Sequence, residues 1–107
     1  MTDKQIINIM AQDAPPGKEE QYNTWTNNHL DVLFKFKGLK KAARYKRIGD
    51  NENVPQYIGV YYFDNFEDFE AYNKSPELAE ALKTEGRPDG IVVKWRAQFE
   101  LIKSWEK

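Results

Sequence analysis

The chain contains 107 residues, of which 40% are apolar, 14% aromatic and 31% charged. This length allows one domain with a single core, and the composition is typical of a folded protein rather than a disordered one. The formal net charge of −1 argues against a general attraction to nucleic acid or to membranes, and the absence of cysteine excludes disulfides, a thiolate nucleophile and zinc fingers. The apolar run near the start is too short for a signal peptide and no later run spans a bilayer, so we expect a cytoplasmic protein without a membrane partner.

The first half of the chain predicts a strand, a helix and a second strand. Residues 5–11 are rich in isoleucine and favour a strand, and residues 13–17 contain the turn-forming sequence Pro-Pro-Gly. Apolar side chains then recur with helical spacing over residues 18–36, which predicts a helix that ends before Gly38. Residues 39–48 predict the second strand, and the polar residues that follow predict a hairpin loop.

The second half predicts a strand, a helical segment and a last strand. Residues 56–63 (QYIGVYYF) are the clearest strand in the chain. Helical structure is expected over residues 64–85, capped at its start by Asp-Asn and restarted at Ser75, which can act as a cap before a proline. Residues 91–101 predict the last strand. The order βαββαβ indicates an α+β, ferredoxin-like fold, in which two helices cover one face of a four-stranded antiparallel sheet.

The predicted third strand is apolar on both of its faces. Alternate residues point to opposite faces of a sheet, which puts Ile58, Val60 and Tyr62 on one face and Tyr57, Tyr61 and Phe63 on the other. Helices can cover only one of these faces. The long segment 91–107, which ends near Trp105, could also reach beyond its own sheet. We therefore expect a homodimer in which two sheets meet face to face, the alternative being a monomer whose aromatic face binds a ligand.

Several segments together resemble proteins of the EthD type. They are PPGKEEQYNTW at 15–25, His29-Leu30, Gly38-Leu39, Ala43-Arg44-Tyr45, the strand 57–63 with the DNFEDFE that follows it, and Ser75-Pro76-Glu77. The resemblance covers nearly the whole chain and implies a single EthD-like domain over residues 1–107, forming a dimeric α/β barrel with a histidine beside its cavity. One departure is that Leu30 and Asp31 follow His29, where the family usually has a proline soon after the histidine. The superfamily includes cofactor-independent monooxygenases, lactone isomerases, polyketide cyclases, haem-binding enzymes and proteins without known activity, so the resemblance implies no single reaction.

His29 is the only histidine and lies on the apolar face of the predicted helix 18–36. That face consists of Tyr22, Trp25, His29, Val32, Leu33 and Phe36. A side chain that titrates near neutral pH is thereby directed inward among aromatic residues, which suits a general acid or base acting on a small apolar or aromatic molecule. We predict that Tyr22 and Trp25 form the wall of the substrate pocket. A buried neutral histidine that is satisfied by one hydrogen bond is the alternative interpretation.

Two further tyrosines are expected to shape the same pocket. Tyr45 belongs to a segment that recurs in the resembled family, and Tyr61 lies near the middle of the third predicted strand. A tyrosine hydroxyl can donate a hydrogen bond to a developing enolate, which would complement a histidine base. Packing with a solvated hydroxyl is the commoner role of a strand tyrosine.

Three classes of function remain open from the sequence. The first is a cofactor-independent monooxygenase, isomerase or cyclase with His29 as proton-transfer residue; the second is a non-catalytic accessory or ligand-binding protein supporting an oxygenase or degradation pathway; the third is a purely structural protein. We expect no metal and no nucleotide cofactor, because the chain lacks suitable ligand spacing and a glycine-rich phosphate loop, although one histidine suffices to bind haem. RNA-recognition modules share the strand order, but residues 5–11 contain no aromatic side chain for base stacking, so we expect no nucleic-acid partner.

Overall fold

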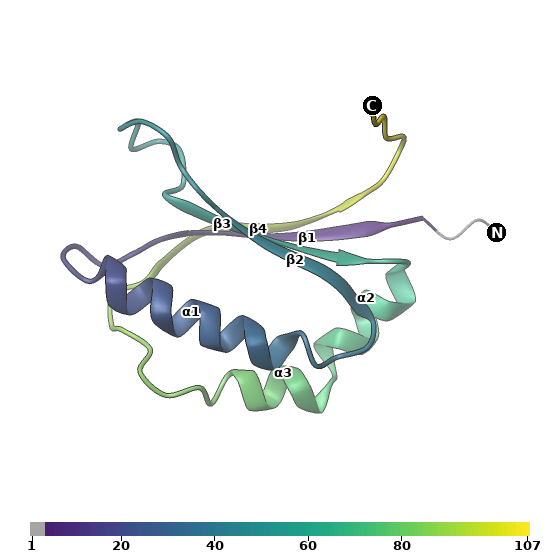
Figure 1. Cartoon of the computed structure of the whole chain (residues 1–107), viewed down its shortest axis with the longest axis horizontal. Coiled ribbons are helices and arrows are strands. Elements are labelled where there is room, and N and C mark those ends of the chain that lie inside the picture. The colour runs from purple at the N-terminus through teal and green to yellow at the C-terminus, as the bar shows by residue number, and fades with distance from the viewer. Residues whose placement is uncertain (1–3) are drawn as a thin grey trace.

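The computed structural model describes residues 4–107, which fold into one sheet covered on one face by helices (Figure 1). The sheet is antiparallel with the strand order β2-β3-β1-β4. Its strands are β1 (Ile6–Asp13), β2 (Leu39–Lys46), β3 (Tyr57–Phe63) and β4 (Val92–Glu100), and the helices are α1 (Glu19–Leu33), α2 (Phe66–Asn73) and α3 (Pro76–Ala81). The predicted α+β, ferredoxin-like architecture is confirmed.

The helix α1 continues for a full turn beyond His29 and ends at Leu33, three residues earlier than predicted. Beyond this point the backbone tightens, because the Lys35 and Phe36 amides donate hydrogen bonds to carbonyls only three residues earlier. The helix therefore runs past His29, at the place where the resembled family usually has a proline soon after the histidine.

The second helical segment consists of two short helices, each with its own cap. The Asn65 side chain accepts a hydrogen bond from the Asp68 amide at 2.8 Å and starts α2, and the Ser75 hydroxyl accepts one from the Leu78 amide at 3.1 Å and starts α3. The predicted restart at Ser75 is thus confirmed. The prediction that the helix continues to residue 85 is wrong, because α3 ends at Ala81 and turns follow it.

The core forms where the helices contact the inner face of the sheet. Cross-strand register pairs Ile6 with Phe63 and Phe63 with Leu39, and all three side chains face the helices. Phe63 is completely buried and contacts the rings of Phe69 and Tyr72 on α2. The predicted division of β3 into two faces is confirmed, since its odd-numbered side chains face the helices.

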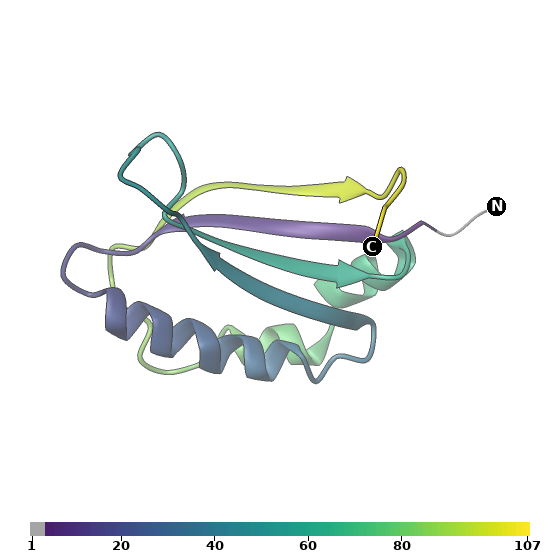
Figure 2. The same cartoon turned by 45° about the horizontal axis from the view of Figure 1, so that its top comes forward.

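No described helix lies on the opposite face of the sheet, although that face is apolar (Figures 1 and 2). The register gives this outer face the side chains of Ile7, Ile9, Ala11, Ala43, Tyr45, Ile58, Val60, Tyr62, Trp95, Ala97 and Phe99. Tyr45, Trp95 and Phe99 are 43–51% exposed. In Figure 1 the loop between β2 and β3 and the C-terminal segment rise on this same side of the sheet, at its two ends.

The last strand is shorter than predicted, and the C-terminal segment is not part of it. β4 ends at Glu100, and beyond it a backbone hydrogen bond joins the Leu101 amide to the Gln5 carbonyl at 2.8 Å. Trp105 is 78% exposed at the end of the chain. None of the helices among residues 4–107 combines the length and the apolar character that crossing a bilayer requires.

Candidate functional site

A cavity of about 430 Å³ lies between the helical layer and the sheet, and His29 and Tyr61 both line it. Every helix and three of the four strands contribute to it. Its remaining lining residues are Asn8, Met10, Leu33, Phe69, Tyr72, Asn73, Leu78, Leu82, Arg96 and Gln98. Its volume falls within the range of sites that bind small organic molecules.

Two contacts hold the His29 ring in the helical layer. Its Nδ1 lies 2.8 Å from the carbonyl oxygen of Ala81 on α3, and its ring stacks on Trp25 with centroids 4.7 Å apart. A carbonyl oxygen can only accept a hydrogen bond, so Nδ1 carries the proton, and in the neutral ring Nε2 keeps its lone pair. Burial lowers the pKa of His29, opposed by the Ala81 hydrogen bond and assisted by the charge of Arg87. The neutral ring, which can act as a base, is therefore the dominant form at pH 7.

The contact between His29 and Ala81 is one of three that join α1 to residues 81–86, at the end of α3 and just after it. Gln21 Nε2 donates to the Gly86 carbonyl at 3.2 Å, and Trp25 Nε1 donates to the Thr84 carbonyl at 3.0 Å. The three α1 side chains are four residues apart and so lie on one face of the helix. These hydrogen bonds tie the segment 81–86 to α1, and the Ala81 carbonyl also accepts one from the Thr84 amide at 3.1 Å.

Two buried tyrosines place neutral hydroxyl groups beside the cavity. Burial raises the pKa of Tyr61 well above its ordinary value, and burial raises the pKa of Tyr72 to about 12. Within residues 4–107, neither hydroxyl has a hydrogen-bond partner. Both groups therefore stay protonated at neutral pH and can donate a hydrogen bond to a ligand oxygen.

Tyr22 and Trp25 are buried as predicted, but they do not line this cavity. The Tyr22 hydroxyl donates to Gln12 Oε1 at 2.7 Å, and its ring lies under the guanidinium of Arg44 at 5.5 Å. The Trp25 ring stacks on the His29 ring and also lines a separate open cleft of about 530 Å³ next to Gly86. Trp25 thus supports the histidine, and Tyr22 packs further along the sheet.

Tyr45 lies on the wrong face of the sheet for the predicted pocket. It pairs with Ile58 on the outer face, whereas Tyr61 pairs with Ala42 on the inner face. The cause is a β-bulge between Leu39 and Lys41, which inserts an extra residue and reverses the facing of the residues after it. The prediction that Tyr45 and Tyr61 share one cavity is therefore wrong.

Three polar strand residues of the cavity, and Asn73 at the end of α2, were not predicted from the sequence. Arg96 and Gln98 on β4 share the inward-facing register with Asn8 on β1, and Gln98 Nε2 donates to Asn8 Oδ1 at 2.9 Å. The signal was present in the strict alternation of residues 94–101, where every second residue is charged or an amide. The sequence alone did not tell which side of β4 faces the helices.

A wider cleft of about 560 Å³ lies between α1 and β2 and is lined by Lys40, Lys41 and Arg44. Lys40 is 4.0 Å from Asp64, Lys41 lies over the Tyr62 ring, and Arg44 donates to two asparagines on α1. These cations are occupied by local contacts on an edge strand. We therefore place the candidate site in the smaller cavity, where His29 and the buried tyrosines converge.

Among residues 4–107, no three histidine, cysteine or acidic side chains gather closely enough to hold a metal ion. The polar groups of the cavity are instead one imidazole, one guanidinium, amides and phenols. This set can donate hydrogen bonds to oxygen atoms of a ligand and can accept one proton from it.

No protein-family model and no curated protein matches this sequence. Solved structures match over nearly the whole chain. A protein from Shewanella loihica PV-4 described as a candidate monooxygenase has a TM-score of 0.73 and 18% identity, covering 97% of this chain and 100% of its own. The hydroxynitrile lyase from Passiflora edulis has a TM-score of 0.73 and 13% identity, covering 98% and 100%.

Two further solved structures have the same fold. A dimeric ferredoxin-like protein of unknown function from Thermobifida fusca has a TM-score of 0.68 and 18% identity, covering 94% of each chain. A cofactor-independent oxygenase from Streptomyces nogalater has a TM-score of 0.65 and 7% identity, covering 99% and 100%. At such identities the likeness shows the fold, and the ferredoxin-like arrangement of this chain is the one these structures share.

Proposed function

We propose that this protein is an EthD-like, cytoplasmic protein of the dimeric α/β-barrel type, formed by a single domain, that binds a small apolar or aromatic organic molecule in the His29 cavity. The chemistry we propose is cofactor-independent proton transfer with His29 as the base. One observation carries the proposal. The Ala81 carbonyl fixes the proton on Nδ1, so that the neutral ring keeps an available lone pair beside a cavity large enough for such a molecule.

The proton transfer follows from the groups present. Nε2 of His29 takes a proton from an acidic C–H or O–H group of the ligand, and the electron pair stays on the ligand as an enolate or phenolate. A hydroxyl of Tyr61 or Tyr72 donates a hydrogen bond to the oxygen where the charge collects. The imidazolium then returns its proton to the ligand at another atom or to water. In an oxygenation, dioxygen is the oxidant and the deprotonated ligand is what it oxidises.

A histidine titration by NMR tests this function, because the chain has one histidine and gives one set of ring signals. We expect a neutral Nδ1–H tautomer at pH 7 and ring signals that shift on adding one class from a panel of lactones, phenols and aromatic acids. Ring signals that no compound of the panel changes would contradict the proposal.

The second candidate is a non-catalytic ligand-binding or accessory protein. The three hydrogen bonds from α1 to the segment 81–86 favour it, because they give His29 a structural task that requires no reaction. In this case a ligand shifts the His29 signals but is recovered unchanged, and no deuterium from D₂O enters it. Deuterium incorporation at the acidic carbon of a bound lactone distinguishes the enzyme from the accessory protein.

We also propose that two copies pack their outer faces together. Trp95, Phe99 and Tyr45 expose large apolar surfaces on this face, which a second sheet would cover. A neighbour described as a dimeric ferredoxin-like protein supports a dimeric state. Light scattering should give twice the monomer mass of 12.6 kDa. Trp95→Lys should shift the mass toward the monomer, whereas Phe34→Lys, an exposed position on the opposite side, should not; a wild-type monomer at micromolar concentration would overturn this arrangement.

A further inference from the structure

We infer that the ligand of the His29 cavity carries a carboxylate group and that Arg96 binds it at the β4 side of the cavity. This inference rests on the proposed function, because it names the class of ligand for the same site. Such a ligand has an apolar body, which enters between the helices and the sheet, and an anionic group, which stays near β4.

The first observation is that Arg96 is an inward-facing arginine whose guanidinium has no partner within residues 4–107. Its cross-strand neighbour is Met10, which offers no acceptor on its side chain beyond a weak thioether. Arg44 on β2 and Arg47, which follows β2, are engaged by contrast. Arg44 donates to Asn23 and Asn27 at 2.8 Å each, and Arg47 donates to three loop carbonyls.

The second observation is that the residues on either side of Arg96 are fixed by contacts of their own. Lys94 lies 3.4 Å from Asp13 and donates to the Glu52 carbonyl at 2.7 Å. Gln98 donates to Asn8 at 2.9 Å. The backbone that carries Arg96 is therefore held in place, while its five donors remain available to a ligand.

The third observation is the charge of the cavity. The whole chain has 17 acidic and 16 basic residues, yet no aspartate or glutamate is among the residues that line this cavity. Arg96 supplies its one permanent charge. A cavity whose only fixed charge is positive favours an anion over a neutral molecule of the same shape.

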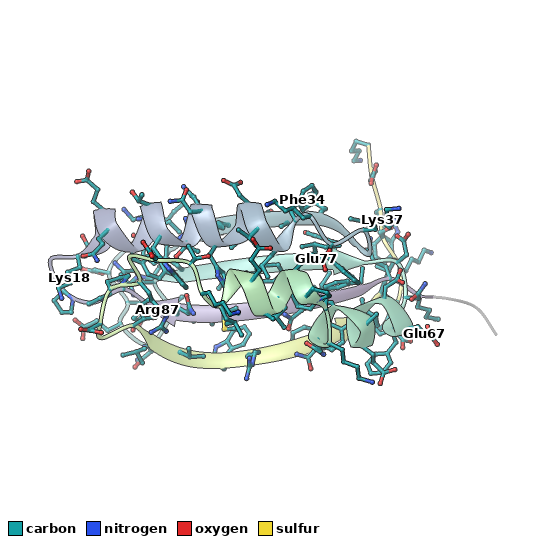
Figure 3. All side chains as sticks on the ribbon, turned by 90° about the horizontal axis from the view of Figure 1, so that it is seen from below. Lys18, Phe34, Lys37, Glu67, Glu77 and Arg87 are labelled. Atoms are coloured by element: carbon teal, nitrogen blue, oxygen red, sulfur yellow. The ribbon has the colours of Figure 1, made fainter. Side chains whose placement is uncertain are left out.

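The fourth observation is the distribution of polarity around the cavity. The helical side is mainly apolar or aromatic and includes Leu33, Phe69 and Leu78, whereas the β4 side carries Arg96 and Gln98. Figure 3 shows β4 at the margin of the molecule, beside the helical layer rather than under it. A planar guanidinium at this margin can bind a carboxylate through two parallel hydrogen bonds while the group keeps part of its water.

Two probes with the same body test the inference: trans-cinnamate, which is ionised at pH 7.5, and cinnamamide, which is neutral. The dissociation constant of each is measured from the His29 ring signals of the full chain. We expect the wild type to bind cinnamate at least about tenfold more tightly than cinnamamide, which is the scale of a hydrogen bond to a charged group.

Three variants distinguish an effect of the Arg96 guanidinium on binding from an effect of the net charge of the protein. Arg96→Gln should bind both probes equally, and Arg96→Lys should keep part of the preference, because lysine offers the charge without the fork. Lys37→Gln removes the same charge from an exposed turn away from β4 and should keep the full preference (Figure 3). Far-UV circular dichroism checks that each variant is folded.

Two results would overturn the inference while the proposed function stands: equal binding of both probes by the wild type, or a preference that survives in Arg96→Gln. In both, the His29 signals still respond to a ligand in the cavity. If neither these probes nor any compound of the panel shifts the His29 signals, the proposed function and this inference fail together.

Discussion

The substitution His29→Asn separates the chemical role of His29 from its structural role. The asparagine amide nitrogen can occupy the position of Nδ1 and keep the hydrogen bond to the Ala81 carbonyl, but nothing replaces the lone pair of Nε2. The stacking on Trp25 at 4.7 Å is also lost. We therefore expect little structural change together with the loss of the base.

The two effects differ greatly in size. Loss of the aromatic stacking costs about 0.5–1.5 kcal/mol, which lowers the melting temperature of a domain of this length by roughly 4–8 °C per kcal/mol. Loss of a general base lowers the rate of proton transfer by about 10²–10⁴-fold. The assay is deuterium incorporation from D₂O into the acidic carbon of a bound lactone, measured beside thermal unfolding of the same sample.

Trp25→Phe is the matched control, because it breaks the neighbouring hydrogen bond to the Thr84 carbonyl but keeps the His29 imidazole and an aromatic ring beside it. Loss of that bond costs about 0.5–1.5 kcal/mol, so its effect on stability resembles that of His29→Asn. We expect exchange to continue in Trp25→Phe within a few-fold of the wild type. If His29→Asn exchanges at the wild-type rate, or if both variants lose exchange equally, His29 is not the base.

Two further predictions concern stability. Because the pKa of His29 is lowered in the folded protein, the unfolded chain binds more protons below its ordinary pKa of about 6.5, so stability should fall as the pH drops from there through the folded pKa. Urea unfolding between pH 5 and 8 should show this slope, and His29→Asn should reduce it. Ser75→Ala removes the Oγ that caps α3 and donates to the Tyr72 carbonyl, and it should cost about 1–2 kcal/mol. Ser104→Ala, at an exposed position, should leave the unfolding midpoint unchanged.

Much of the architecture was predictable because local signals agree with the tertiary contacts. The alternation in residues 57–63 gave the two faces of β3 correctly, since Tyr61 and Phe63 face the helices and Val60 does not. Ser75 combines a cap with a following proline, and this pair starts α3 as expected. The ends of elements were less predictable, because the segment 81–86 is also held by side chains of α1, and such long-range contacts do not show in the local sequence.

The candidate site was harder to predict because its composition depends on strand register. Uninterrupted alternation from Leu39 would point Tyr45 toward the helices, but the bulge in β2 reverses it. Residue spacing alone does not reveal a bulge when the residues around it, such as Lys40 and Lys41, are alike. His29 and Tyr61 reach the cavity because no such interruption lies between them and the buried residues that anchor their elements.

The strand β4 connects the cavity with the outer face. Its apolar set, Trp95, Ala97 and Phe99, turns away from the helices, and its polar set, Arg96 and Gln98, turns toward them. In a monomer burial does not favour this orientation, since both sets contact solvent. The orientation becomes favourable when a second sheet covers Trp95 and Phe99 and a polar ligand group meets Arg96. One strand thus supports both the dimer and the anionic ligand, and it does so from a register in which neither Arg96 nor Trp95 can change face without the other.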